Sequence, residues 1–397
     1  MDRLMTHWSR VLVERCIVSH ILAAAVVGFC MLSAPRPATA EPIYTVVDLG
    51  ALGVSGNISG GLGINAGGDA TGYSLTTGGA THAFRYTDGS GMVDLGTLGG
   101  TESYGFGINA SGQVAGQSHV AGNVTVHAFR YTDGPGMVDL GTLGGTQSYG
   151  TGINASGQVA GYSITTGGVS HAFRYTDGPG MVDLGTLGGT LSFGSAINVS
   201  GQVAGYATTT GNVASHAFRY TDGVGIVDLG TLGGTSSYGL GINAGGQVAG
   251  YSATAGNAET HAFRYTDGTG MLDLGTLGGA FSYGYGINAS GQIVGVSGTT
   301  ALVAHAFLHD GTTLYDLNDL LVPGSGWTLY EARAINDAGQ IVATGFNPAH
   351  GTHALRLDPV NVEAVPDESS AAALFGIGLL ATVALRWRAM RRRPARA

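Results

Sequence analysis

Histidine is the side chain that most often binds transition metals or transfers protons near neutral pH, and in this chain it recurs at one place in a repeated phrase. The phrase is His-Ala-Phe or His-Ala-Leu, and it begins at His82, His127, His171, His216, His261, His305 and His353. Equivalent residues on stacked sheets lie about 10 Å apart, too far to share a zinc ion whose ligands lie within about 2.1 Å. We therefore expect no metal site, and we expect each imidazole to bond a backbone or hydroxyl group of its own sheet.

Arginine and aspartate recur nine residues apart, a spacing that could place a cation beside an acid or base. The pairs are Arg85 with Asp94, Arg130 with Asp139, Arg174 with Asp183, Arg219 with Asp228, Arg264 with Asp273 and, across the two ends of the domain, Arg356 with Asp48. If Gly134 and Pro135 form a two-residue hairpin tip, the paired residues face one another across two strands and contribute about 0.2–1 kcal/mol per pair. Leu308 replaces the arginine in one copy, which would leave Asp316 unpaired. Because the pair recurs, we interpret it as structural.

Aromatic side chains stand at the start of one predicted strand in most copies of the repeat. They are Tyr104, Tyr149, Phe193, Tyr238, Tyr283 and Tyr330, with Trp327 close by. Such rings can stack on the faces of sugars or pack between neighbouring sheets. The sequence leaves both roles open, and Phe193 in place of tyrosine favours packing.

Other recurring motifs do not match cofactor chemistry. The turn Tyr-Thr-Asp-Gly-x-Gly supplies one carboxylate, whereas calcium takes six to eight oxygen ligands, and Gly-Thr-Leu-Gly-Gly-Thr lacks the lysine and helix of a phosphate-binding loop. No Ser/His/Asp set or carboxylate pair stands out from the repeat, so we expect no cofactor and no catalytic residue. Three breaks in the repetition are the candidates for an asymmetric site: Asp69 where other copies have Gln, Gln117 where others have Tyr, and the insertion Gly324-Ser325-Gly326-Trp327.

All these residues belong to one repeat of about 45 residues. Its signature, Gly-Ile-Asn or a close variant, centres on Asn65, Asn109, Asn154, Asn198, Asn243, Asn288 and Asn336. The period is close to the ~40–45 residues of a four-stranded propeller blade. One copy predicts strands at 149–153, 158–163, 171–176 and 181–185, separated by Asn-x-x-Gly and Asp-Gly turns, and a long crossing at 185–192.

The phase of the repeat predicts how the array closes. The domain begins with the fourth strand of a copy, at 44–50, and ends with a third strand, at 353–357, so its two ends can complete one sheet. An open β-solenoid would expose sheet edges and require capping repeats, and neither end resembles a cap. We therefore predict an all-β fold, a seven-bladed β-propeller whose ring is closed by pairing of these two strands.

The two ends of the chain carry targeting signals. Residues 1–40 combine basic residues, an apolar run and Ala38-Thr39-Ala40, which is typical of a cleavable signal peptide. Residues 41–360 form the repeat domain, residues 361–370 a linker, and residues 371–397 an apolar helix followed by an arginine cluster. We expect this helix to anchor the protein in the membrane with the arginines on the cytoplasmic side.

Charge excludes one class of partner. Residues 41–365 contain seven arginines, no lysine and 22 acidic residues. A net charge of −15, with His neutral, disfavours nucleic acid, whose phosphates are contacted by clustered Lys or Arg.

Two resemblances follow from these motifs. The combination of His-Ala-Phe, Asp-Leu-Gly-Thr-Leu-Gly-Gly and Gly-Ile-Asn over about residues 43–358 resembles the HAF family of extracellular repeats. The tail, Val365-Pro366-Asp367-Glu368-Ser369-Ser370 followed by an apolar helix and arginines, resembles the PEP-CTERM sorting tail of exported Gram-negative proteins, although Asp367-Glu368 stands where that family has Glu-Pro. The tail resemblance implies sorting by a membrane-embedded exosortase and an association with extracellular polysaccharide.

The sequence therefore predicts an exported, envelope-anchored propeller that acts as a non-catalytic binding or structural module for polysaccharide or a surface protein. Its variable, polar loops between the second and third strands are the expected binding segments. The alternative is a carbohydrate-active hydrolase or lyase with its site in the propeller channel.

Overall fold

The computed structural model describes residues 42–53 and 58–360, which belong to one compact unit. The predicted signal peptide, linker and membrane helix lie outside the described residues. Among the residues that are described, no helix is long and apolar enough to span a bilayer.

The regular secondary structure of the described chain is β-strand apart from two single-turn 3₁₀ helices. The elements are β1 (Tyr44–Asp48), β2 (Ser59–Ile64), β3 (Ala70–Leu75), β4 (Thr81–Thr87), β5 (Gly91–Asp94), β6 (Gly99–Ile108), β7 (Val114–Val120), β8 (Val126–Thr132), β9 (Gly136–Asp139), β10 (Gly144–Ile153), β11 (Val159–Thr165), β12 (Ser170–Thr176), β13 (Gly180–Asp183), β14 (Gly188–Ile197), β15 (Val203–Thr209), η1 (Thr210–Asn212), β16 (Ser215–Thr221), β17 (Gly225–Asp228), β18 (Gly233–Ile242), β19 (Val248–Thr254), η2 (Ala255–Asn257), β20 (Thr260–Thr266), β21 (Gly270–Asp273), β22 (Gly278–Ile287), β23 (Ile293–Thr299), β24 (Ala304–His309), β25 (Leu314–Asp316), β26 (Thr328–Ile335), β27 (Ile341–Asn347) and β28 (Gly351–Pro359).

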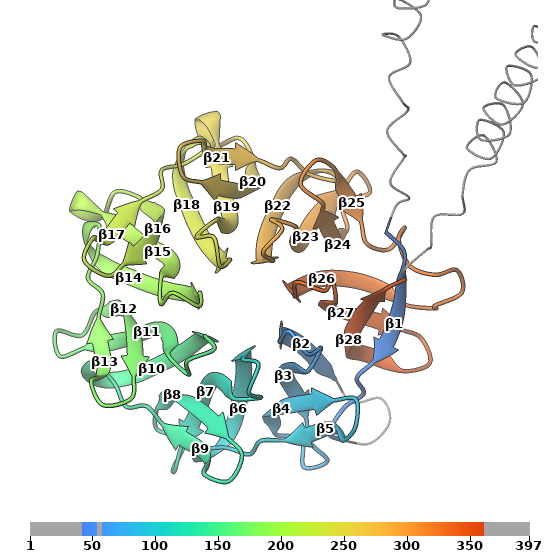
Figure 1. Cartoon of the computed structure of the whole chain (residues 1–397), viewed down its shortest axis with the longest axis horizontal. Helices are drawn as coiled ribbons and strands as arrows, with labels where there is room; N and C mark the ends of the chain where they lie inside the picture. Colours follow the sequence, from blue (N-terminus) through green and yellow to red (C-terminus); the bar gives the residue numbers. More distant parts are fainter. Residues whose placement is uncertain (1–41, 54–57, 361–397) are drawn as a thin grey trace, which may run out of the picture. The chain divides into compact units, whose positions relative to one another are not determined.

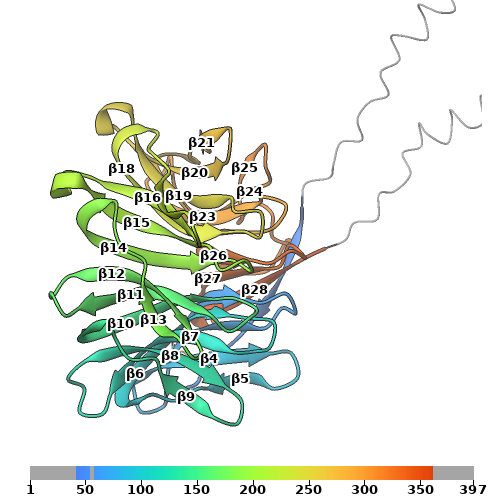
Figure 2. The same ribbon diagram turned by 60° about the vertical axis from the view of Figure 1, so that its left-hand side comes forward.

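The strands form five four-stranded sheets and one eight-stranded sheet. Within each four-stranded unit the strands are antiparallel, and they follow chain order except in the unit β26-β27-β28-β1, whose outer strand is the first of the described chain. The units β18–β21 and β22–β25 are joined into the larger sheet by the single parallel pair Thr260 and Phe281. Figure 1 shows the units arranged around a central opening, with β2, β6, β10, β14, β18, β22 and β26 innermost, and Figure 2 shows the same units stacked face on face. This radial arrangement is that of a β-propeller.

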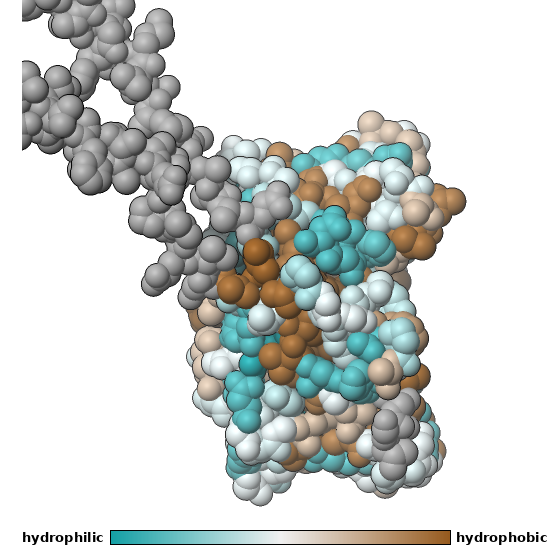
Figure 3. All heavy atoms as spheres, turned by 90° about the vertical axis from the view of Figure 1, so that its right-hand side faces the viewer, coloured by the Kyte–Doolittle hydropathy of each residue, from teal (hydrophilic) through white to brown (hydrophobic). Residues whose placement is uncertain are grey.

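The two ends of the described chain meet in one sheet, as predicted. β1 pairs antiparallel with β28, from Tyr44 opposite Pro359 to Asp48 opposite Leu355, and the order of that sheet is β1-β28-β27-β26. Figure 3 views this side of the molecule, where apolar residues reach the surface; Ile43 and Val360, which flank the pairing, are both more than a third exposed. Pairing of the termini therefore completes this four-stranded sheet from the two ends of the described chain.

The innermost strands begin earlier than the sequence predicts. β10 starts at Gly144 rather than at residue 149, and the crossing expected at 185–192 shortens because β14 already begins at Gly188. Gly144 has a φ of +92°, which an L side chain rarely adopts, and its register partner is Thr165 at the far end of β11. The added residues extend the inner strand along its neighbour.

Apolar residues of neighbouring sheets interdigitate to form the core. One cluster joins Ala115 and Ala128 of the β6–β9 sheet to Val159 and Phe173 of the next sheet, and each of these four side chains is fully buried. The core is therefore a set of similar layers between sheets, with one layer per junction.

A ring of buried asparagines ties the inner strands together. The Nδ2 of each Gly-Ile-Asn asparagine donates to the backbone carbonyl of the asparagine in the next sheet, at 3.0–3.2 Å, and the Asn336 amide donates to the Asn65 carbonyl. The same amide donates to a carboxamide or carboxylate oxygen four residues on, and Asp69 fills this role for Asn65 exactly where glutamine does elsewhere. The substitution of Asp69 for glutamine thus preserves a structural contact.

Candidate functional site in the central channel

One position of the inner strand that varies from repeat to repeat faces the central channel. It lies two residues before the isoleucine of Gly-Ile-Asn, and its residues are Leu62, Phe106, Thr151, Ser195, Leu240, Tyr285 and Arg333. All line one cavity of about 630 Å³, a volume within the range of small-molecule sites. Sequence analysis missed this position, although the contrast between its variation and the constancy of its neighbours could have revealed it.

Aromatic rings form an arc around one side of this cavity. In the middle of the arc each inner-strand ring stacks on a tyrosine of the second strand, as Tyr149 does on Tyr162, with ring centroids 4.6 Å apart. That tyrosine then contacts the inner-strand ring of the next sheet, as Tyr162 does with Phe193 at 5.0 Å. The contacts continue through Phe193, Tyr206, Tyr238, Tyr251, Tyr283 and Phe281.

The predicted aromatics divide between rings that line the cavity and rings that only pack against other rings. Tyr104 and Phe193 line the cavity, and so do the second-strand tyrosines Tyr73, Tyr162 and Tyr206. The remaining predicted rings pack ring against ring between strands and sheets: Tyr149, Tyr238 and Tyr283. Trp327 lies elsewhere, 5.9 Å from the ring centroids of both His350 and His353.

A charged group interrupts the arc at β26. Tyr330 lies at a bulge in the pairing of β26 with β27, so that Glu331 rather than an aromatic ring stands opposite the second strand, facing Thr344. The Glu331 carboxylate pairs with the Arg333 guanidinium at 2.8 Å. The same guanidinium lies over the ring of Tyr285, 4.1 Å from its centroid. Burial raises the pKa of Tyr285, against the opposing effect of Arg333, so this phenol stays neutral at physiological pH.

The arc is also broken at Gln117, the second predicted break in the repetition. Gln117 and Tyr104 line both the channel cavity and a smaller one of about 200 Å³, whose wall includes Glu102 and His119. The His119 Nδ1 lies 3.9 Å from the Glu102 carboxylate. A tyrosine at position 117 would fill part of this space, as it does in other repeats.

A second cavity in the channel is lined by residues of the repeated Gly-Ile-Asn motif. The isoleucines and asparagines of Gly-Ile-Asn, with the residue that follows each, surround a cavity of about 260 Å³. The side chains of the asparagines are committed to the ring of hydrogen bonds described above. The variable cavity is therefore the better candidate for a ligand site.

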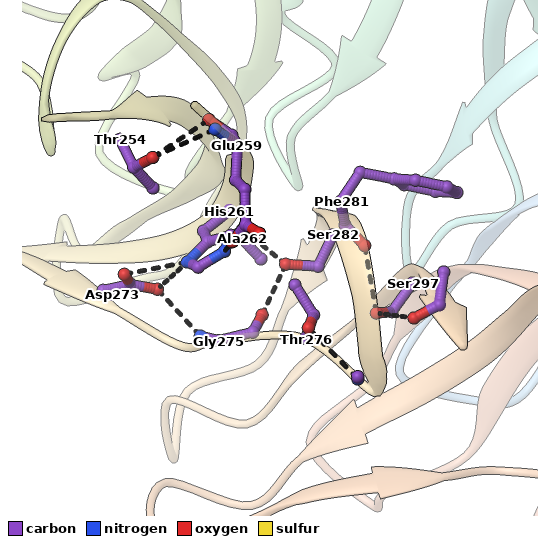
Figure 4. A network of polar contacts seen from close by, with 12 residues as sticks. Thr254, Glu259, His261, Ala262, Asp273, Gly275, Thr276, Phe281, Ser282 and Ser297 are labelled. Atoms are coloured by element: carbon purple, nitrogen blue, oxygen red, sulfur yellow. Dashed lines mark hydrogen bonds and ion pairs between the residues drawn. The ribbon is translucent and has the colours of Figure 1, made fainter. Parts of the chain in front are cut away.

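The repeated histidines bind carboxylates, not the backbone or hydroxyl groups that we expected. Nδ1 of each lies 2.6–2.9 Å from a carboxylate oxygen of the recurring Asp-Leu aspartate, as His261 does from Asp273. Figure 4 shows how this contact continues: Asp273 accepts from the Gly275 amide, and the Ser282 hydroxyl of β22, in the next four-stranded unit, donates to the Gly275 carbonyl and accepts from the Ala262 amide. The repeated polar residues thus join sheets to one another.

The predicted pairing of Arg with Asp across each hairpin is wrong. The hairpin loop has three residues rather than two, because Thr132 pairs with Gly136, and this shifts the register so that Arg130 faces Val138 and Phe129 faces Asp139. A shift of one residue places a side chain on the opposite face of a sheet. The aspartates Asp94, Asp139, Asp183, Asp228, Asp273, Asp316 and Asp48 therefore meet histidines instead.

The arginines reach the next sheet. Arg85, Arg130, Arg174 and Arg219 pair with Asp133, Asp177, Asp222 and Asp267 at 2.9–3.0 Å. Arg264 donates to the Gly291 carbonyl, and Arg356 pairs with Asp88 of the first four-stranded sheet and with Asp358. Leu308 faces the sheet built from the two ends of the chain, in which the equivalent hairpin is absent, and it packs into an apolar cluster with Leu320 and Tyr44.

We expect His261 to titrate at a higher pH than an ordinary histidine. Burial lowers its pKa, but hydrogen bonds to Asp273 and Glu259 outweigh burial and raise it. Because the folded pKa is the higher one, the stabilisation is complete below about 6.5, the unfolded value, and is lost as the pH rises through the folded pKa. NMR titration of the full chain should show this pKa fall in Glu259→Gln and stay unchanged in Glu102→Gln.

The described residues contain no group of three or more His, Cys, Asp or Glu side chains that could hold a metal ion. The lining of the 630 Å³ cavity contains aromatic, hydroxyl, amide, aliphatic and guanidinium groups, and it includes no carboxylate or imidazole in this part of the chain. Such a surface is suited to binding an uncharged, amphipathic ligand through stacking and hydrogen bonds.

No family model and no curated protein matches the chain. Among solved structures, the β-propeller domain of the Trilobed protease from Pyrococcus furiosus is 8% identical and covers 78% of this chain and 100% of its own, with a TM-score of 0.52. A puromycin-hydrolyzing peptidase from Mycobacterium tuberculosis is 12% identical, with 80% and 56% covered and a TM-score of 0.48, and the BP39L lectin from Burkholderia pseudomallei is 7% identical, with 81% and 99% covered and a TM-score of 0.44. Of these three, the first alone supports a comparison, and at 8% identity it shows the fold alone: the chain is a β-propeller.

Proposed function

We propose that this chain is a seven-bladed β-propeller that acts as a non-catalytic binding module and holds a carbohydrate in its central channel. The blade count is supported by the asparagine ring, which has one member for each repeat, and by the single residue pair that links the two halves of the eight-stranded sheet. On this count each half is a blade of its own.

The binding proposal rests on a difference in sequence variation between the residues that hold the sheets together and the residues that face the channel. Residues that hold the sheets together are nearly identical from copy to copy, whereas the channel position ranges from Leu62 to Arg333. Variation at one position around the wall of a cavity, on inner strands that are otherwise similar, is the pattern of a ligand site on a constant scaffold. The aromatic arc offers rings for the apolar faces of sugars, and the neighbouring hydroxyl, amide and guanidinium groups offer hydrogen bonds.

The proposed location is the outside of the inner membrane. The signal at 1–40, the resemblance to HAF extracellular repeats and the PEP-CTERM-like tail support export, membrane anchoring through residues 371–397 and handling by an exosortase. Extracellular polysaccharide is then the proposed ligand, with a surface protein as the alternative partner.

Filling the channel tests the proposal. We expect Ser195→Phe in the full-length chain to reduce binding on an array of neutral and acidic oligosaccharides by at least about tenfold, because the new ring occupies the cavity. The fold should tolerate the change, since Phe106 and Tyr285 already stand at the same position in other repeats.

The matched control is Ser156→Phe, which places the same ring on the exposed turn after Asn154, at a residue that does not line the 630 Å³ cavity. It should leave both binding and melting temperature unchanged. Equal glycan binding by wild type and Ser195→Phe would show that the channel is not the site.

A hydrolase or lyase is the second candidate, and the asymmetric cluster of Glu331, Arg333 and Tyr285 favours it. Glycoside hydrolysis ordinarily needs two carboxylates flanking the bond, and this cluster supplies one. Release of reducing ends or unsaturated sugars from a bound oligosaccharide would establish the enzyme.

A further inference from the structure

One arginine of the described chain is used differently from all the others. Six arginines donate to a glycine carbonyl of the neighbouring sheet: Arg85, Arg130, Arg174, Arg219, Arg264 and Arg356. Arg333 instead lines the channel cavity. Because the described residues contain no lysine, Arg333 is the single cation in the wall of that cavity.

Contacts on two sides hold the Arg333 guanidinium in place. The ring of Tyr285 lies 4.1 Å from it on one side, close enough for a cation–π interaction. The Glu331 carboxylate binds Nη2 at 2.8 Å. Both charged side chains remain about a third exposed, 34% for Arg333 and 27% for Glu331, so the guanidinium is fixed in orientation and still reachable from the cavity.

Glu331 cancels the charge that Arg333 brings to the cavity. No carboxylate lies in the cavity wall among the described residues, and the carboxylate of Glu331 is bound to the single cation there. A carboxylate on a ligand that bound the remaining N–H groups of that guanidinium would approach the like charge of Glu331. A neutral sugar hydroxyl accepts a hydrogen bond from the same groups without that penalty.

We infer that the channel selects uncharged sugars over acidic ones, and that Glu331 is the residue that sets this selectivity. In this arrangement Arg333 donates to hydroxyl oxygens of the sugar, and the rings of Tyr162, Phe193 and Tyr206 meet its apolar face from the aromatic side of the cavity. The inference rests on the proposed carbohydrate binding in the channel, and it adds the class of sugar and the residue that determines it.

The test compares two probes of equal length, a neutral hexasaccharide of β-linked glucose and a hexasaccharide of galacturonate, by titration calorimetry with the full-length chain. Wild type should bind the neutral probe at least about tenfold more tightly. Glu331→Gln removes the negative charge and nearly preserves the shape, and it should strengthen binding of the galacturonate probe by about tenfold or more. Arg333→Thr, which introduces the residue found at position 151, should weaken binding of both probes.

Glu259→Gln is the control for a change in the net charge of the protein. It removes one negative charge from β19–β20, where Glu259 pairs with His261 away from the channel, and it should leave both affinities unchanged. A wild type that prefers galacturonate, or a Glu331→Gln variant with unaltered selectivity, overturns the inference while leaving channel binding intact. If no probe or array sugar binds any variant, and Ser195→Phe is equally without effect, the proposed function fails and the inference fails with it.

Discussion

Replacing Gly161 with alanine is expected to prevent the domain from folding. Gly161 lies in β11 opposite Gly150, and a Cβ at this position would lie far inside contact distance of the Tyr149 carbonyl oxygen and 3.0 Å from the ring of Phe173. The obstructing atom belongs to the backbone of a strand paired with β11, so it cannot move without breaking the sheet. We expect a loss of about 4 kcal/mol or more in the free energy of unfolding.

Gly167→Ala is the matched control because it adds the same methyl group in the loop after β11. Gly167 does not have a positive φ, and the nearest atom to its new Cβ would be the Thr165 hydroxyl oxygen at 3.6 Å. Its unfolding free energy should change by less than about 0.5 kcal/mol. Denaturant titration followed by circular dichroism measures both, and a Gly161→Ala variant as stable as Gly167→Ala would contradict the strand register described here.

Replacing Asn109 with alanine is expected to lower the unfolding free energy by about 3 kcal/mol. The buried Asn109 side chain donates to the Gln113 side chain and to the Asn154 carbonyl, and it accepts from the backbone amides of Ser111 and Gln113. Alanine leaves these groups without partners, and an unpaired buried polar group costs about 1–3 kcal/mol. The change also opens the asparagine ring between two sheets.

Ser111→Ala provides the comparison for Asn109→Ala. Ser111 is exposed, lies in the same turn and contributes its backbone amide to the network, and alanine retains that amide. Its unfolding free energy should stay within about 0.5 kcal/mol of wild type. If Asn109→Ala were equally harmless, the ring of side chains would not be holding the inner strands together.

The sequence predicts much of the fold because each repeat contains the residues that form its turns. Asn-Ala-Ser-Gly and Asp-Gly-Pro-Gly locate the hairpins, since Gly157 and Gly180 adopt positive φ values of 78° and 79°. The phase of the repeat predicts that β1 completes the sheet of β28, and the pairing agrees. Sequence reasoning erred where one residue of loop length decides the outcome, because a three-residue loop instead of two exchanges the partners of Arg130 and Asp139.

Sequence alone determined the repeat, its four strands, the pairing of the chain ends and the recurrence of histidine, aspartate and aromatic residues. Tertiary structure alone decided which of these residues meet and which face the channel. Successive side chains of a strand point to opposite faces of the sheet, and a polar face ordinarily marks the side exposed to solvent. Both faces of a propeller blade are buried against neighbouring blades. The sequence pattern therefore cannot identify which residues line the central channel. The bulge at Tyr330, which gives Glu331 the place of an aromatic ring beside Arg333, exists only when β26 pairs with β27. That pairing places the Glu331 carboxylate beside the cation of the cavity wall.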